Sequence, residues 1–216
     1  MSKMLITRPN HDTTTAYLSK WSEHLINAAK KRRISYSDFK GQKASRGDVE
    51  KYLMKQNSPL AVFNGHGSDD TIFGHKNEAL IKSGENEHLL KSKAVYSVSC
   101  SSAKVLGPKA VSACAKCFIG YNDVFIFASD KNCSAGRELD DELALPFLDS
   151  SNQIVLSLLN GRTSGEAYEK SQAFFRKWIE HFGSSAALPG SEAIVSWLIW
   201  DRFCQKIEGD KNVCID

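Results

Sequence analysis

Long apolar runs are missing from this 216-residue sequence, and their absence excludes two kinds of segment. The opening stretch MSKMLITRPNHDTTT holds no apolar segment long enough for a secretory signal peptide. No window approaches the length that spans a bilayer. We therefore expect a cytoplasmic protein with no membrane partner. In that compartment the six cysteines are better explained as free thiols than as a disulfide framework.

An excess of one charge is also missing. The chain has 28 basic and 25 acidic residues, a formal net charge of +3, spread along its length. This balance lacks the clustered basic patch of nucleic-acid-binding proteins. The densest basic cluster, residues 30–33, falls where we expect a helix to end, and the helix dipole favours cations there. We expect no direct nucleic-acid partner.

Signatures of metals and cofactors are equally sparse. Cys114 and Cys117 form a CxxC motif, but no second pair at zinc-binding spacing accompanies them. We interpret this motif as two small residues at a helix end. No glycine-rich phosphate loop opens a helix. The sequence thus predicts neither a metal nor a cofactor.

What the sequence does contain is an alternation of short apolar runs with helical patterns. Strands are expected at 4–7, 34–39, 60–63 and 93–100, with one or two more within 117–129. Helices are expected over 13–31, 45–56, 101–114, 138–159, 165–182 and 191–204, with a short one near 87–91. This order predicts a single α/β domain over residues 1–216, a three-layer α/β/α sandwich around a mostly parallel sheet.

Two of the expected strands end in residues that carry chemistry. The stretch LAVFNGHGSDD places His66 between Gly65 and Gly67, and KAVYSVSC ends in Cys100. Parallel sheets place their ligand sites at the carboxyl ends of their strands. If these two strands are neighbours, the imidazole and the thiol leave the same edge of the sheet.

Such a pair suits nucleophilic catalysis. A cysteine attacks a carbonyl as a thiolate, which a nearby imidazole or a helix N-terminus favours. We expect His66 to supply the imidazole and a helix beginning at Ser101 to supply the helix N-terminus. The oxyanion formed by the attack needs backbone N–H donors, and those of Gly67 and Cys100 are the candidates.

The motif AVFNGHG followed by VYSVSC resembles the caspase-like (clan CD) cysteine peptidases. The later stretch 147–168 is similar to the helical segments of bacterial gingipain-like and CHAT-like proteases. The resemblance implies a caspase-like fold, with His66 as general acid/base, Cys100 as nucleophile, and the amides of Gly67 and Cys100 as the oxyanion hole. It also implies an endopeptidase that cleaves a protein or peptide substrate through a thioester, is activated by a partner or signal, and serves in bacterial, antiviral defence.

The resemblance leaves substrate preference open. Relatives that select basic residues often carry an acid two residues before the cysteine, where this sequence has Val98. Asp123, in GYND, is an alternative acid for such a pocket. An apolar pocket around Tyr121, Val124 and Phe125 is the rival, and Asp69 is a further candidate for lining the cleft.

Two further questions stay open at this stage. The polar stretch 129–146 is placed like the linker that some relatives cleave during activation, with Arg137 as a cut site, or it is a solvated surface loop. A catalytically silent caspase-like interaction module and a flavodoxin-like ligand binder are the alternative functions. The intact Gly-His-Gly and cysteine argue against the first, and the missing phosphate loop argues against the second.

Overall fold

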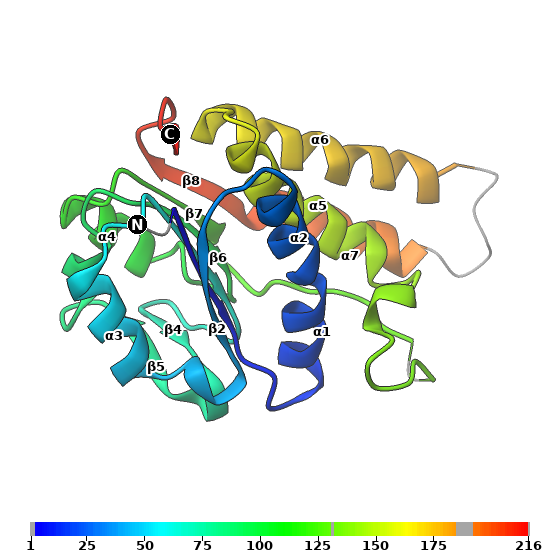
Figure 1. The fold of residues 1–216 in the computed structure, drawn as a ribbon. Coiled ribbons are helices and arrows are strands. Elements are labelled where there is room, and N and C mark those ends of the chain that lie inside the picture. The colour runs from blue at the N-terminus through cyan, green and yellow to red at the C-terminus, as the bar shows by residue number, and fades with distance from the viewer. Residues whose placement is uncertain (1–2, 131, 185–191, 216) are drawn as a thin grey trace.

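A six-stranded sheet lies between two layers of helices in the computed structural model, which describes residues 3–130, 132–184 and 192–215 (Figure 1). The strand order is β2-β1-β3-β6-β7-β8. The first five strands in this order are parallel, and β8 is antiparallel to β7. The strand bounds are β1 Met4–Arg8, β2 Tyr36–Lys40, β3 Leu60–Asn64, β6 Ala94–Val98, β7 Cys117–Tyr121 and β8 Gln205–Gly209.

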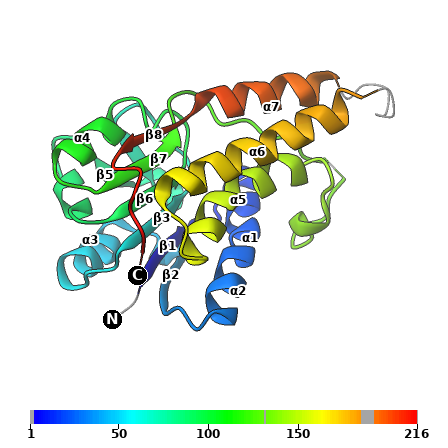
Figure 2. The same ribbon diagram turned by 90° about the horizontal axis from the view of Figure 1, so that it is seen from above.

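Alternation along the strands divides the core into two parts. In β3, Leu60 and Val62 face the larger cluster, whereas Ala61 and Phe63 face the smaller one. The larger cluster is covered by helices α1 Thr13–Trp21, α2 Glu23–Lys31, α5 Leu145–Leu159, α6 Ser164–Phe182 and α7 Glu192–Cys204 (Figure 2). The smaller cluster is covered by α3 Arg46–Lys55, α4 Leu106–Ser112 and the hairpin of β4 Thr71–Phe73 and β5 Ala79–Lys82.

The predicted three-layer α/β/α class is therefore confirmed, with a mostly parallel sheet. Ser45 caps α3, since its hydroxyl accepts the N–H of Asp48. The predicted short helix is a 3-10 helix over Glu87–Leu90. Three further 3-10 turns cover Gly41–Lys43, His75–Asn77 and Glu138–Asp140.

Several boundaries differ from the prediction. The helix expected over 13–31 is two helices, because the chain breaks at Ser22 between α1 and α2. The helix expected over 138–159 begins only at Leu145, and Pro146 lies in its first turn, where its missing N–H costs nothing. The β4–β5 hairpin and β8 were not predicted, and 122–130 holds no further strand. Residue 191, the predicted start of the last helix, lies outside the described residues.

None of the helices within the described part of the chain combines the length and the apolar character that crossing a bilayer requires.

Candidate active site

The strands that carry His66 and Cys100 are neighbours in the sheet. β3 and β6 pair in parallel with Asn64 opposite Val98, and the N–H of Gly65 donates to the carbonyl of Val98 at 3.2 Å. The chain therefore leaves both strands at the same edge, with His66 two residues past the end of β3 and Cys100 two residues past the end of β6.

Two glycines make this junction possible. A Cβ added at Gly67 would lie 2.5 Å from the carbonyl oxygen of Cys100 and 2.7 Å from the Cβ of Ser99. Gly65 has φ +147°, and a Cβ there would lie 2.6 Å from the carbonyl oxygen of Phe73. Any larger residue would push these backbones apart. The structure thus brings the backbone of Gly67 against that of Cys100.

The imidazole of His66 is held by a residue that the sequence analysis missed. Its Nε2 lies 2.7 Å from Oδ2 of Asp12, the N-cap residue of α1. The other oxygen of Asp12, Oδ1, accepts the N–H of Thr15 at 2.8 Å. One carboxylate therefore caps a helix and orients the ring. The available signal was an aspartate directly before the predicted helix, a preferred N-cap position.

Asp12 is ionised in this arrangement. Partial burial raises its pKa, but the hydrogen bonds from the Thr15 N–H and from His66 outweigh that effect and lower the pKa to about 2. A carboxylate bonded to one ring nitrogen fixes the tautomer of a neutral histidine. With Nε2 donating to Asp12, the lone pair of His66 is on Nδ1.

Cys100 is in a different electrostatic state from the one expected. The predicted helix at Ser101 is absent; residues 101–105 form turns, and α4 begins at Leu106. The first free N–H groups there, of Val105 and Leu106, donate to the carbonyl of Asp69. A helix dipole therefore does not stabilise a Cys100 thiolate.

Burial instead raises the pKa of the Cys100 thiol. The half-buried sulfur lies 3.9 Å from the carbonyl oxygen of Phe125, to which the S–H donates. A thiol that is protonated and covered in this way is not yet a nucleophile.

The segment after β7 covers this cysteine. The N–H of Ser101, a residue with φ 56°, donates to the carbonyl of Asp123 at 2.9 Å. Further along, Nε1 of Trp200 in α7 donates to the carbonyl of Val124 at 2.9 Å. The N–H of Ile126 donates to Asp201 at the same distance. Helix α7 therefore holds residues 123–126 beside Cys100.

The predicted substrate-binding residues are placed very differently from one another. Asp123 is exposed next to the Cys100 turn, and its carboxylate accepts the N–H of Val124. Asp69 forms an ion pair with Lys104 at 2.8 Å. Tyr121 is fully buried and donates its hydroxyl to Ser151, so its side chain does not reach the surface. Tyr121 can shape a pocket only from behind Phe125, whose ring centroid lies 4.6 Å away.

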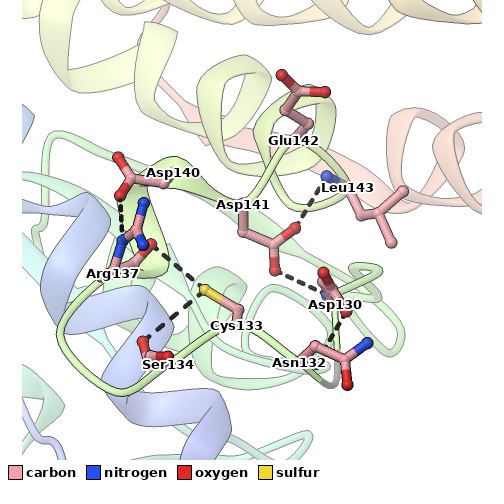
Figure 3. A pocket seen from close by; sticks show the side chains of 9 residues that line it. All are labelled: Asp130, Asn132, Cys133, Ser134, Arg137, Asp140, Asp141, Glu142 and Leu143. Atoms are coloured by element: carbon pink, nitrogen blue, oxygen red, sulfur yellow. Dashed lines mark hydrogen bonds and ion pairs between the residues drawn. The ribbon is translucent and has the colours of Figure 1, made fainter.

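A cleft of about 550 Å³ runs from the start of α1 to the stretch 129–138, and His11, Asp12, Asp130 and Cys133 are among its lining residues. It shares Asp130 and Cys133 with a neighbouring pocket of about 420 Å³ (Figure 3). Four carboxylates line that pocket, from Asp130, Asp140, Asp141 and Glu142, with Arg137 paired to Asp140. The stretch 129–146 therefore makes this neighbouring pocket acidic. Neither His66 nor Cys100 is among the residues that line the cleft or this neighbouring pocket.

Comparison with known proteins finds solved structures of similar fold. Neither a family model nor a curated protein matches the sequence. The chain is similar to the Arg-specific cysteine proteinase gingipain R, with a TM-score of 0.61 and 11% identity. The match covers 98% of this chain and 46% of the gingipain chain, so this chain spans about half the length of that protein. The likeness, at this identity, shows a shared caspase-like fold.

Proposed function

We propose that this protein is a cysteine endopeptidase with Cys100 as nucleophile and His66 as general acid/base. The observation that carries the proposal is the junction of β3 and β6, where the backbone of Gly67 touches that of Cys100 and Asp12 orients the His66 ring. These are the groups that acyl transfer to a thiol needs: a nucleophile, an oriented base and backbone donors. The fold shared with gingipain R supports the same assignment.

In the proposed reaction, Nδ1 of His66 takes the proton of Cys100, and the thiolate attacks the carbonyl carbon of the substrate peptide bond. The N–H groups of Gly67 and Cys100 stabilise the oxyanion of the tetrahedral intermediate. His66 then gives its proton to the leaving amine, so the C–N bond breaks and a thioester remains. Water, deprotonated by His66, hydrolyses that thioester. Asp12 stays ionised and stabilises the transient imidazolium.

We infer that the described conformation is a restrained one. The raised pKa of Cys100 and the bond of its thiol to Phe125 both oppose attack. Activation by a partner or signal then consists of moving residues 123–126 off the sulfur. Such restraint suits a protease of the cytoplasm, where the six free thiols remain reduced, and the defence role that the resemblance implies.

For the substrate, we propose a basic residue before the cut. Exposed Asp123 lies beside the cysteine turn, and a carboxylate there attracts a cationic side chain of the substrate. An apolar residue packing on Val124 and Phe125 is the rival.

A second candidate function is a catalytically silent caspase-like module that binds a partner. The covered, protonated state of Cys100 favours it. The two candidates differ in whether Cys100 reacts with an electrophile shaped like a substrate.

The test is alkylation by two peptidyl chloromethylketones, one with arginine and one with leucine next to the reactive group, located by mass spectrometry. We expect label on Cys100, faster with arginine, and at least about 10-fold slower labelling in His66→Ala. Cys133→Ala, which removes a half-buried thiol of the neighbouring loop, is the matched control and should label at the wild-type rate. Label on Cys133 instead, or a His66→Ala protein that reacts as fast as wild type, would overturn the assignment.

A further inference from the structure

A group of metal-ligating side chains surrounds the histidine of the proposed dyad. His11, Asp12 and His66 each offer one ligand atom, and these three atoms lie within 4.8 Å of one another. Oδ2 of Asp12 is 2.7 Å from the Nε2 of His66 and 3.5 Å from the Nε2 of His11. Two imidazoles from different segments thus converge on one carboxylate oxygen.

We propose that His11, Asp12 and His66 form a zinc(II) site that, when occupied, takes the general base out of the peptidase reaction. Two histidines and one carboxylate are a donor set that Zn²⁺ prefers. Zn–N and Zn–O bonds of about 2.0–2.1 Å place tetrahedral ligands about 3.3 Å apart. The 3.5 Å separation meets this spacing, and the 2.7 Å pair widens by about half an ångström as a metal replaces the shared proton.

Neighbouring residues fix the orientation of the ligands Asp12 and His11. Oδ1 of Asp12 is occupied by Thr15, which leaves Oδ2 to face the two rings. The side chain of His11 is only 12% exposed, and its ring packs edge-on against His75 with centroids 5.4 Å apart.

The functional consequence, which rests on the proposed function, follows from the tautomers of His66. In the described state Nε2–H donates to Asp12, and Nδ1 holds the lone pair that would accept the Cys100 proton. A neutral imidazole has one such lone pair. Zinc bound at Nε2 uses it and moves the ring proton to Nδ1. His66 then donates at Nδ1 and no longer acts as a base.

The first test measures binding of zinc alone. Protein stripped with a chelator is titrated with ZnCl₂ by calorimetry and equilibrium dialysis. We expect one zinc per chain, at least about 10-fold weaker affinity in His11→Ala and His11→Gln, and no change in His88→Ala, an exposed histidine outside the cluster. A cobalt(II) spectrum without sulfur-to-metal charge transfer would confirm nitrogen and oxygen ligands. The site would be overturned if zinc did not bind one-to-one, or if the His11 variants bound zinc as tightly as His88→Ala. A thiolate-to-cobalt band in the spectrum would overturn it as well.

The second test separates the site from the peptidase. Cleavage is measured with and without zinc, each variant relative to its own zinc-free rate. We expect zinc to inhibit the wild type reversibly, and to need at least about 10-fold more metal in His11→Gln. Zinc binding with the expected variant pattern but no cleavage under any condition supports the site and overturns the proposed function. Cleavage that zinc leaves unchanged at saturation supports the peptidase and overturns the inhibitory role.

Discussion

At the scale of single residues, Asp12 has two roles that can be separated. Its Oδ1 caps α1 through Thr15, and its Oδ2 orients His66. Asparagine is as good an N-cap as aspartate, whereas alanine is not. Asp12→Asn and Asp12→Ala therefore distinguish helix capping from the electrostatic effect of the carboxylate on His66.

We expect Asp12→Asn to lower kcat/KM for peptide cleavage at least about 10-fold, with thermal stability nearly unchanged. Asp12→Ala should lose activity as well and unfold about 1 kcal/mol more easily, by urea titration. Full activity in Asp12→Asn would show that the carboxylate does not assist His66.

Asp201 is a second residue whose role can be separated, because it makes the free energy of unfolding depend on pH. It is fully buried, one oxygen accepts the N–H of Ile126, and the other has no partner among the described residues. Burial raises its pKa well above the usual value, and the bond from Ile126 only partly opposes this. Because the folded pKa is above the unfolded value of about 3.9, stability is greatest below that pH and falls as the pH rises toward the folded pKa.

Wild-type unfolding free energy should therefore decline above about pH 4, with Asp201 contributing at most about 1.4 kcal/mol per pH unit. Asp201→Asn should remove that contribution, so the two stability curves diverge as the pH rises. Urea midpoints across pH 4–8 measure this. Parallel curves would mean that Asp201 ionises freely in the folded protein.

At the scale of elements, the contact between the ends of β3 and β6 determines the site. Gly67 has no room for a Cβ against Cys100, whereas Gly47 in α3 has open space around it. The two glycines thus form a matched pair, one at the junction and one on a helix.

We expect Gly67→Ala to destabilise the fold by about 1–3 kcal/mol and to reduce cleavage at least about 10-fold, because the Cys100 carbonyl must move. Gly47→Ala should stabilise the protein by about 0.5–1 kcal/mol and leave cleavage unchanged. Thermal unfolding and peptide turnover measure both. Retained activity in Gly67→Ala would argue against its amide in the oxyanion hole.

The hold of α7 on residues 123–126 is the second feature at this scale. Trp200→Phe removes the bond to Val124 and keeps an aromatic ring. A bond of about 0.5–1.5 kcal/mol predicts roughly 2- to 10-fold faster alkylation of Cys100 by iodoacetamide. Trp197→Phe, on the same helix and equally exposed at 38%, is the control and should react like wild type. Equal rates in both variants would remove α7 from the proposed restraint.

At the scale of the whole molecule, one buried side chain joins segments far apart in the chain. Gln205, at the start of β8, donates to Tyr121 at 3.2 Å and Ser171 at 3.0 Å, and accepts from Gln172 at 3.1 Å. It thereby links β7 and β8, at one edge of the sheet, to α6.

Gln205→Leu should lower the free energy of unfolding by about 2–3 kcal/mol, since it leaves buried polar partners unsatisfied. Gln42→Leu, at an exposed position, should stay within about 0.5 kcal/mol of wild type. Urea denaturation measures both. An equally small effect of the two substitutions would show that this network is dispensable.

The order of elements and the two strand ends were readable from sequence because they are local. Apolar runs identify β3 and β6, and glycines beside His66 mark a turn that side chains would block. The three-layer class follows from strand–helix alternation. The β4–β5 hairpin was not recognised because its strands are only three and four residues long. Strand β8 was not recognised because its partner β7 lies far away in the chain.

Sequence by itself thus determined the class of fold and predicted that His66 and Cys100 act as a pair. Tertiary structure alone decided that Asp12 orients the ring, that His11 joins it, and that Phe125 covers the sulfur. The physical reason is that hydrogen bonds, burial and charge act through space between residues 25 or more positions apart. Periodicity and spacing record which residues lie along one element, and a pKa depends on which elements meet.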